Sequence, residues 1–206
     1  MKYNPSRIIP PELLIQAYKR GYFPMSESRN DESFEWYTAR KRGIIPIDRF
    51  HVSSNVHRLI RQGRYTARAN TSFREVMEHC AGRDSTWISE LLIDSYEVLH
   101  HQGYAHSIEI FDASGSMVGG QYGVSVGAAF FGESMFKSAK EADKIALYYT
   151  HWILEKNGFE LWDTQFFMDH LAQFGCIEIP AEEYRKKLNS AIKKNAIFTF
   201  PASPKK

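Results

Sequence analysis

Residues 105–136 read AHSIEIFDASGSMVGGQYGVSVGAAFFGESMF, and this stretch decides the fold class. It is rich in β-branched and aromatic residues and is broken by a turn at Asp112–Gly115, so it predicts successive antiparallel strands. Glycines interrupt these strands at positions 119, 120, 123, 127 and 132. Glycine inside a strand marks a bulge or a close approach by a ligand. The stretch therefore predicts a sheet whose strands contain bulges or are closely approached by a ligand.

Helical patterns lie on both sides of this stretch. From Phe73 to Cys80 apolar residues recur at i, i+3, i+4 and i+7, and Leu92 to Leu99 continues at helical spacing. Other segments with helical spacing are 11–20, 53–62, 140–157, 168–174 and 181–194. Short strands are predicted over 65–69, 159–163 and 177–179. This order predicts a mixed sheet flanked by helices, which is an α+β (mixed α/β) fold.

The chain length of 206 residues allows one large core with a small appended unit. Residues 26–33 are polar and show no periodicity, which predicts an exposed loop. We expect a small N-terminal domain over residues 1–46, ending near Pro46, and a larger domain over residues 47–206. Basic residues crowd one part of the sequence and predict a basic face: Arg40, Lys41, Arg42, Arg49, Arg58, Arg61, Arg64 and Arg68.

Composition limits the class of protein. Hydrophobic residues make up 43% and charged residues 24%, and no apolar run approaches the roughly 20 residues that span a bilayer. The first residues lack the apolar stretch of a secretory signal, so we expect a cytoplasmic protein. Cys80 and Cys176 lie in no metal-binding pattern and are predicted to be reduced, buried thiols. We therefore expect no membrane, metal or cofactor.

Three segments place a titratable, amide or aromatic group where packing does not require one. Glu133 follows two phenylalanines and a glycine, and a carboxylate in apolar surroundings is costly without a partner or a cationic ligand. Asp163 and Gln165 end a predicted strand and point to the same side, so the carboxylate can orient the amide. Trp87 follows a polar loop and can stack on a base. The alternative for Glu133 is a solvated turn, the alternative for Asp163 is a helix cap, and the alternative for Trp87 is a lid over the core.

In their joint arrangement these segments resemble the bacterial leucyl/phenylalanyl-tRNA-protein transferases. The matching segments run in order between about residues 11 and 188: 17–24, 85–88, 103–109, 118–124, 132–136 and 163–165. The resemblance implies a small N-terminal domain packed on a domain like that of the GCN5-related acetyltransferases. It also implies ATP-independent transfer of Leu or Phe from aminoacyl-tRNA to acceptor proteins that begin with Arg or Lys, which marks them for degradation.

The resemblance also implies roles for single residues. Asp163 would orient Gln165, whose amide carbonyl accepts a hydrogen bond from the attacking amine, and Glu133 would bind an amino group. Trp87 and Met25 would hold the terminal adenosine, although the family usually has Trp at the position of Met25. Arg58, Arg61 and Arg64 would bind phosphates of the tRNA, and such contacts do not depend on the nucleotide sequence.

A pocket for the donor side chain is the last feature that the resemblance implies. Its members here are Gln121, Phe130, Met135, Leu147, Thr150 and Trp162. Gln121 and Thr150 stand where the family typically has Met and Phe, and Trp162 replaces a smaller aliphatic residue. Each polar group needs a partner if it faces the pocket, because an unpaired one costs about 1–3 kcal/mol. Alternatively, both bond to neighbouring backbone and leave an apolar wall. We expect leucine to remain a donor, with an altered preference for phenylalanine and tolerance of methionine or a polar side chain.

Two other functions remain open at this level. A CoA-dependent N-acetyltransferase would need a glycine-rich turn that opens a helix and holds the pyrophosphate, and Lys137–Ala142 contains no glycine. A non-catalytic tRNA-binding module would need the arginines and Trp87 but neither Asp163 nor Gln165. The sequence sets no oligomeric state, and we expect a monomer.

Overall fold

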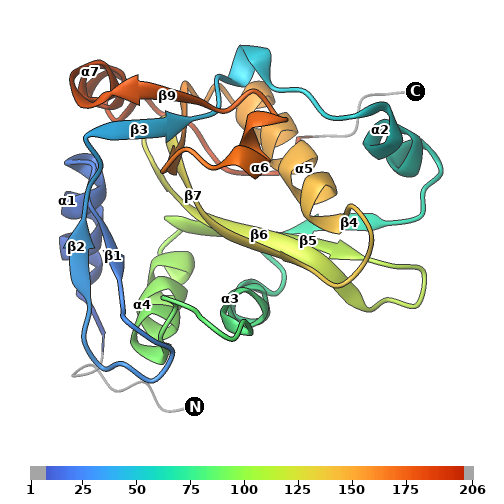
Figure 1. Ribbon diagram of the computed structural model, residues 1–206, viewed down its shortest axis with the longest axis horizontal. Coiled ribbons are helices and arrows are strands. Elements are labelled where there is room, and N and C mark those ends of the chain that lie inside the picture. The colour runs from blue at the N-terminus through green and yellow to red at the C-terminus, as the bar shows by residue number, and fades with distance from the viewer. Residues whose placement is uncertain (1–7, 202–206) are drawn as a thin grey trace.

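A computed structural model describes residues 8–201 and shows a seven-stranded mixed sheet with helices on both faces (Figure 1). The order of strands across this sheet is β4-β5-β6-β7-β8-β3-β9. The predicted α+β fold, a mixed sheet flanked by helices, is confirmed. Residues 1–5, part of the segment on which the expected lack of a secretory signal rests, lie outside the described residues.

The predicted antiparallel strands form the centre of the sheet. They are β5 (Ala105–Phe111), β6 (Met117–Val126) and β7 (Ala129–Lys137), and β4 (Thr66–Ala69) pairs with β5 at the edge. The turn between β5 and β6 is held by Asp112, whose carbonyl accepts from the main-chain N–H of Gly115 at 3.0 Å. Because helices cover both faces of the sheet, β6 is buried over almost its whole length.

Strands β7 and β8 (Leu161–Gln165) run parallel, and they separate after a short paired region. Three pairs join them, from Ala129 with Leu161 to Phe131 with Asp163. Beyond these pairs, within residues 8–201, β7 is joined only to β6, and β8 only to β3 (Lys41–Ile44). A gap therefore opens between the two central strands from Gly132 and Thr164 onward. Beyond β3, the last strand of the sheet is β9 (Ile177–Pro180).

Helices pack on the two faces of the sheet as their apolar stripes predict. One face is covered by α3 (Phe73–Ala81) and α4 (Glu90–His101), and the other by α5 (Ala142–Lys156), with α2 (Ser54–Arg61) beside it (Figure 1). Helix α5 connects the parallel strands β7 and β8, which need such a crossover. The remaining helices are α6 (Asp169–Ala172), which is shorter than predicted, and α7 (Ala181–Ala191). Both cysteines are free and buried, as predicted.

The N-terminal part consists of α1 (Pro11–Lys19) and a small hairpin of β1 (Phe23–Met25) and β2 (Glu35–Tyr37). The predicted loop over residues 26–33 joins the two strands. Strand β3 belongs to the large sheet although it precedes the expected boundary near Pro46, and the 3-10 helix η2 (Ile47–Arg49) follows it. The division into two domains remains a prediction, and we would place its boundary near residue 40.

Two surface predictions can be compared with residues 8–201. None of the helices in this part of the chain is both long and apolar enough to cross a membrane. Seven of the eight residues of the predicted basic face are exposed. The exception is Arg42, which is 1% exposed, so including it in a basic face was wrong.

Candidate functional site

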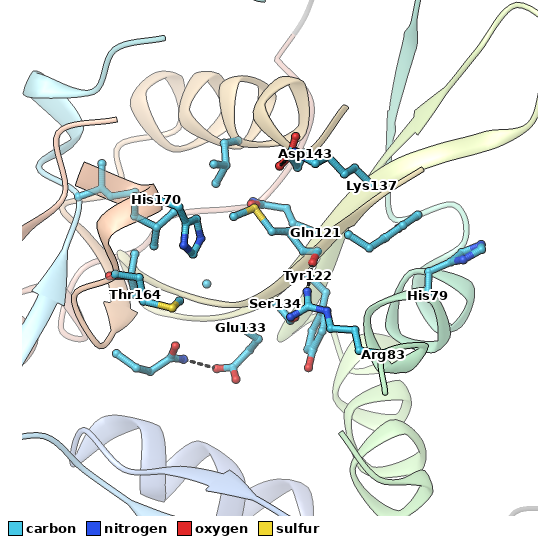
Figure 2. Close-up of a pocket in the computed structure, with 18 of the residues that line it drawn as sticks. His79, Arg83, Gln121, Tyr122, Glu133, Ser134, Lys137, Asp143, Thr164 and His170 are labelled. Atoms are coloured by element: carbon cyan, nitrogen blue, oxygen red, sulfur yellow. Dashed lines mark hydrogen bonds and ion pairs between the residues drawn. The ribbon is translucent and has the colours of Figure 1, made fainter. Parts of the chain in front are cut away.

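A cavity of about 790 Å³ lies where β7 and β8 separate. Its walls come from β6, β7, β8, α5 and the segment after α3, and Figure 2 shows most of the side chains that line it. Gly132 stands at the point of separation, and a Cβ built there would lie 3.3 Å from the indole nitrogen of Trp162. The glycine therefore keeps the two strands close at the start of the cavity.

A buried ion pair lies behind this cavity. The guanidinium of Arg42 donates to both carboxylate oxygens of Asp163, from Nε at 2.9 Å to Oδ1 and from Nη2 at 2.8 Å to Oδ2. The Tyr184 hydroxyl donates to Oδ2 at 2.5 Å, and Arg42 Nη1 donates to the carbonyl of Gly21 at 3.0 Å. The guanidinium carbon also lies over the rings of Phe23 and Tyr184, at 5.0 and 4.6 Å from their centroids. Burial alone would lower the pKa of Arg42, but the charge of Asp163 raises it. A carboxylate so fully bonded is fixed in place.

Asp163 fixes Gln165 through the main chain. Its Oδ1 accepts from the main-chain N–H of Gln165 at 2.8 Å. Gln165 has φ 58°, a left-handed conformation that is unfavourable for a residue with a side chain. The side-chain amide donates instead to Glu133 Oε1, at 2.8 Å. The prediction that the Asp163 carboxylate orients the side-chain amide of Gln165 was wrong in one detail. The carboxylate bonds to the main-chain N–H of Gln165, because the tight turn brings the main chain to it.

Glu133 joins the catalytic residues predicted from the sequence into one network. Its Oε1 accepts from Gln165 and from the Tyr18 hydroxyl at 2.7 Å, and Tyr18 is hydrogen-bonded to the hydroxyl of Tyr96. Burial raises the pKa of Glu133 to about 8 against the opposing hydrogen bond from Tyr18, and the charge of Asp163 raises it further. The Glu133 carboxylate is therefore largely protonated near neutral pH when the cavity is empty.

This protonation should be visible in the stability of the protein. Between the ordinary value of 4.5 and about 8, folded Glu133 keeps a proton that the unfolded chain has lost. The contribution of Glu133 to stability must then fall as pH rises across this window and level off above it. We expect this slope to be absent in Glu133→Gln. Urea unfolding of both proteins from about pH 5 to about pH 9 measures the difference. Parallel curves of unfolding free energy against pH for the wild type and Glu133→Gln would contradict the raised pKa. Glu178→Gln, on the exposed part of β9, is the control and should keep the slope of the wild type.

The residues predicted to form the donor pocket divide into two groups. Those that line the cavity are Gln121, Met135, Leu147 and Trp162. Phe130 and Thr150 do not line it, so the sequence-based prediction needs correction there. Phe130 is buried and stacks on Phe198 at 5.1 Å, and the Thr150 hydroxyl is bonded to the Gln121 amide. Gln121 and Thr150 therefore bond to each other, whereas the sequence suggested that they either face the pocket or bond to neighbouring backbone.

The residues predicted to bind tRNA lie at separate places. Trp87 lines the cavity and is partly buried, and its carbonyl accepts from the main-chain N–H of Ser26 at 3.1 Å. Met25 packs against the core and is not among the cavity-lining residues. The arginines are exposed, on α2 or in the loop that follows it: Arg58, Arg61 and Arg64. The structure thus brings Trp87 to the site but not Met25.

Sequence reasoning missed several residues of this network. Arg42 was assigned to a basic face with its basic neighbours, and the one local feature against this assignment was the apolar pair Ile44 and Ile45 that follows it. Tyr18 lies in one of the matched segments, whereas nothing in the local pattern singled out Tyr96 or Tyr184. Further cationic side chains at the cavity are Arg83 and Lys137, of which Arg83 donates to the carbonyl of Met135.

Comparisons with known proteins give consistent matches. The family described as Leucyl/phenylalanyl-tRNA protein transferase matches residues 44–189, and its N-terminal domain matches residues 7–40. A leucyl/phenylalanyl-tRNA–protein transferase of Ruegeria pomeroyi is 45% identical over 190 residues, which cover 92% of this chain and 90% of the relative. One from Gloeobacter violaceus is 46% identical over 182 residues, 88% of this chain and 93% of the relative.

A likeness to a solved structure concerns the fold alone. The crystal structure of FemX matches with a TM-score of 0.52 at 11% identity, covering 80% of this chain and 65% of that one. The two sequence matches to the family meet between residues 40 and 44, at strand β3. This position supports a domain boundary near residue 40.

Proposed function

Since this chain belongs to the leucyl/phenylalanyl-tRNA protein transferase family, an enzyme family that moves aminoacyl groups from tRNA to proteins, we propose its donors and acceptors in more detail. The donor is leucyl-tRNA, with phenylalanyl- or methionyl-tRNA as further donors. The acceptor is the N-terminal amine of proteins that begin with Arg or Lys, and the product is marked for degradation. The observation that carries this proposal is the network of Asp163, Gln165 and Glu133 at the gap between β7 and β8.

Positioning of the amine is sufficient for this chemistry. The ester of aminoacyl-tRNA is already activated, so no ATP is needed. An N-terminal amine has a pKa of about 7.7–8.0, and roughly a tenth of it is neutral at pH 7. Holding that amine against the ester can supply about 7–11 kcal/mol in favourable cases.

Gln165 is oriented for this task. Its amide nitrogen donates to Glu133, so its carbonyl oxygen is left to accept from the attacking amine. Glu133 uses Oε1 for both of its hydrogen bonds, which leaves Oε2 for an amino group of either substrate. Binding of an ammonium there would favour the ionised carboxylate. The Arg42–Asp163 pair fixes the turn from which Gln165 acts.

A set of acceptor peptides tests the proposed specificity. The peptides share one sequence and begin with Arg, Lys, Gly or N-acetyl-Arg, and leucyl-tRNA is the donor. We expect transfer to the Arg and Lys peptides and none to the acetylated peptide, which has no amine. Equal transfer to Gly and Arg peptides would contradict the acceptor specificity while leaving aminoacyl transfer intact.

Binding of tRNA should depend on the exposed arginines through phosphate neutralisation. The affinity for charged tRNA should fall steeply with salt. For each arginine that contacts a phosphate, replacement by Ala should reduce the slope of log affinity against log salt concentration by about one. Filter binding at several salt concentrations measures this for Arg58, Arg61 and Arg64. Lys186→Ala on α7, where Lys186 is paired with Glu182, is the matched control. An affinity for charged tRNA that is independent of salt would contradict the assignment.

The alternative of a CoA-dependent acetyltransferase loses support at α5. A pyrophosphate would bind at the N-terminus of this helix, through free N–H groups and the positive end of the helix dipole. Here that end carries the carboxylates of Glu141 and Asp143. Asp143 is paired with Lys137 at 3.0 Å and Glu141 with Lys144 at 2.8 Å, so ion pairs, and not an open anion site, occupy this end of the helix. The proposed substrates also imply a cytoplasmic protein, and a monomer remains our expectation.

A further inference from the structure

One basic side chain of the cavity has no carboxylate partner. Arg83 lies in the loop between α3 and α4, lines the cavity, and forms no ion pair within residues 8–201. Its Nη2 donates to the main-chain carbonyl of Met135, in the part of β7 beyond the last pair with β8. The guanidinium therefore lies at the edge of the gap between the two strands. A guanidinium has several N–H donors, and among the described residues only this one is bonded.

The charges of the cavity leave Arg83 uncompensated. Apart from two histidines, the basic and acidic side chains that line it are Arg83, Lys137, Glu133 and Asp143. Lys137 and Asp143 neutralise each other in an ion pair of 3.0 Å. Glu133 largely keeps its proton near neutral pH, because burial raises its pKa to about 8. The positive charge that remains is that of Arg83, and it favours an anionic ligand.

Arg83 lies where the nucleotide end of the donor is expected. Trp87, in the same loop, also lines the cavity and is the residue predicted to stack on the terminal adenosine. Figure 2 shows Arg83 and Lys137 on one side of the cavity and His170 on the opposite side. In a nucleotide the 5′-phosphate is joined to the same ribose as the base. The phosphate of an adenosine that stacks on Trp87 therefore lies close to this loop.

The acceptor does not fit the charge of Arg83. Its first side chain is that of Arg or Lys in the proposed function, and its N-terminus is an amine. Both groups are cationic when protonated, so Arg83 repels them and Glu133 attracts them. A phosphodiester of the donor carries a negative charge, and the planar guanidinium can bond to two of its oxygens. The anion that Arg83 favours therefore belongs to the donor.

We propose that Arg83 binds the 5′-phosphate of the terminal adenosine of the donor. This inference rests on the proposed function, since it concerns a further part of the same donor. The bond from Arg83 to the Met135 carbonyl places the phosphate relative to the gap in which the aminoacyl group is transferred. This contact needs only the last nucleotide, whereas phosphates further along the tRNA would meet the exposed arginines on α2 or after it: Arg58, Arg61 and Arg64.

Two unreactive donor analogues that differ by one phosphate test the proposal. Both carry leucine in amide linkage on adenosine, and one of them also carries a 5′-methylphosphate, which has the single negative charge of a phosphodiester. We expect the methylphosphate to increase the affinity of the wild type at least about tenfold at low salt. In Arg83→Gln this gain should fall to less than about twofold. The affinity for the analogue without phosphate should stay the same, which shows that the variant folds.

Two further variants test the chemistry of the contact. Arg83→Lys should keep part of the gain, because lysine supplies the charge but not the planar pair of donors. Arg185→Gln, at an exposed position of α7, makes the same replacement away from the cavity and should keep the gain in full. An equal gain in the wild type and in Arg83→Gln, or no gain in either protein, would overturn the proposal.

Other outcomes separate this inference from the proposed function. Leucyl transfer by the wild type together with a phosphate gain that does not depend on Arg83 would overturn the phosphate site alone. A wild type that binds neither analogue would contradict the proposed donor, and the phosphate site with it. A third outcome is that Arg83→Gln keeps the gain but slows transfer to a peptide with Asp after its N-terminal Arg. Arg83 would then contact the acceptor, and the proposal would be overturned.

Discussion

Asp163→Asn is expected to lower the free energy of unfolding by about 3–5 kcal/mol. The replacement keeps the size of the side chain but removes the charge that Arg42 faces, and Arg42 is 1% exposed. A buried cation without its counter-charge is strongly unfavourable, because neither water nor another acid replaces the lost interaction. Urea unfolding at neutral pH measures the change, and the slope of the transition shows whether the folded state keeps its compactness.

Two further variants isolate the cause. The double variant Arg42→Met with Asp163→Leu should lose less stability than Asp163→Asn alone, since no buried charge is left unpaired. A surface ion pair next to Arg42 on β3 serves as the control, because Lys41 pairs with Glu178 at 3.0 Å. Glu178→Gln should change the free energy of unfolding by about 0–1 kcal/mol. If Asp163→Asn cost no more than Glu178→Gln, the ion pair would not hold this part of the fold.

Gln165→Ala should reduce transfer at least about tenfold, with the loss in kcat rather than in the affinity for the donor. Its carbonyl is the proposed acceptor for the amine, and Asp163 and Glu133 fix the residue from both ends. Asp163→Ala should lose a similar factor because it releases the same turn. The transfer rate of the double variant should fall by less than the product of the two single factors, since Asp163 and Gln165 act together as one positioning unit.

The control for this series is Gln102→Ala, which removes an exposed amide next to α4 and should leave transfer unchanged. Single-turnover measurement with saturating donor separates the chemical step from binding. Wild-type turnover in both single variants would remove Asp163 and Gln165 from the catalytic unit. It would favour a module that binds tRNA without catalysis.

The parts of the fold that could be predicted are those with a local signal. The strands within residues 105–136 follow from β-branched residues and one turn, and the helix at Phe73 from four apolar residues at helical spacing. Strands β1 and β2 were not predicted, because each has only three residues, and β3 was missed although β4 and β9 are equally short and were predicted. Pro24 in β1 and the basic residues in β3 also argue against a strand by local rules.

The candidate site was predictable at the positions that break a local pattern. Glu133, Asp163 and Gln165 each put a polar group at an apolar strand, and the structure joins them. Arg42 could not be found in this way, because its partner lies 121 residues further along the chain. The same holds for Tyr18 and Tyr96, which are 78 residues apart. Pairs so distant in sequence meet only through the order of strands and helices, which periodicity does not specify.

The pairing of Gln121 with Thr150 shows the same limit for specificity. Both residues were recognised as departures in a donor pocket, but their relation depends on how α5 lies over β6. Gln121 lines the cavity, whereas Thr150, its partner on α5, does not. The sequence could name the two residues, whereas their pairing emerged only from the arrangement of α5 over β6.

The most direct test of the account is transfer of labelled leucine from leucyl-tRNA to an Arg-starting peptide by the purified chain, without ATP or CoA. We predict that the label appears on the N-terminal amine of the peptide with the wild type and that Gln165→Ala loses at least about nine-tenths of the rate. Label that stays on the tRNA with the wild type, or transfer that is equal in wild type and Gln165→Ala, would contradict the account.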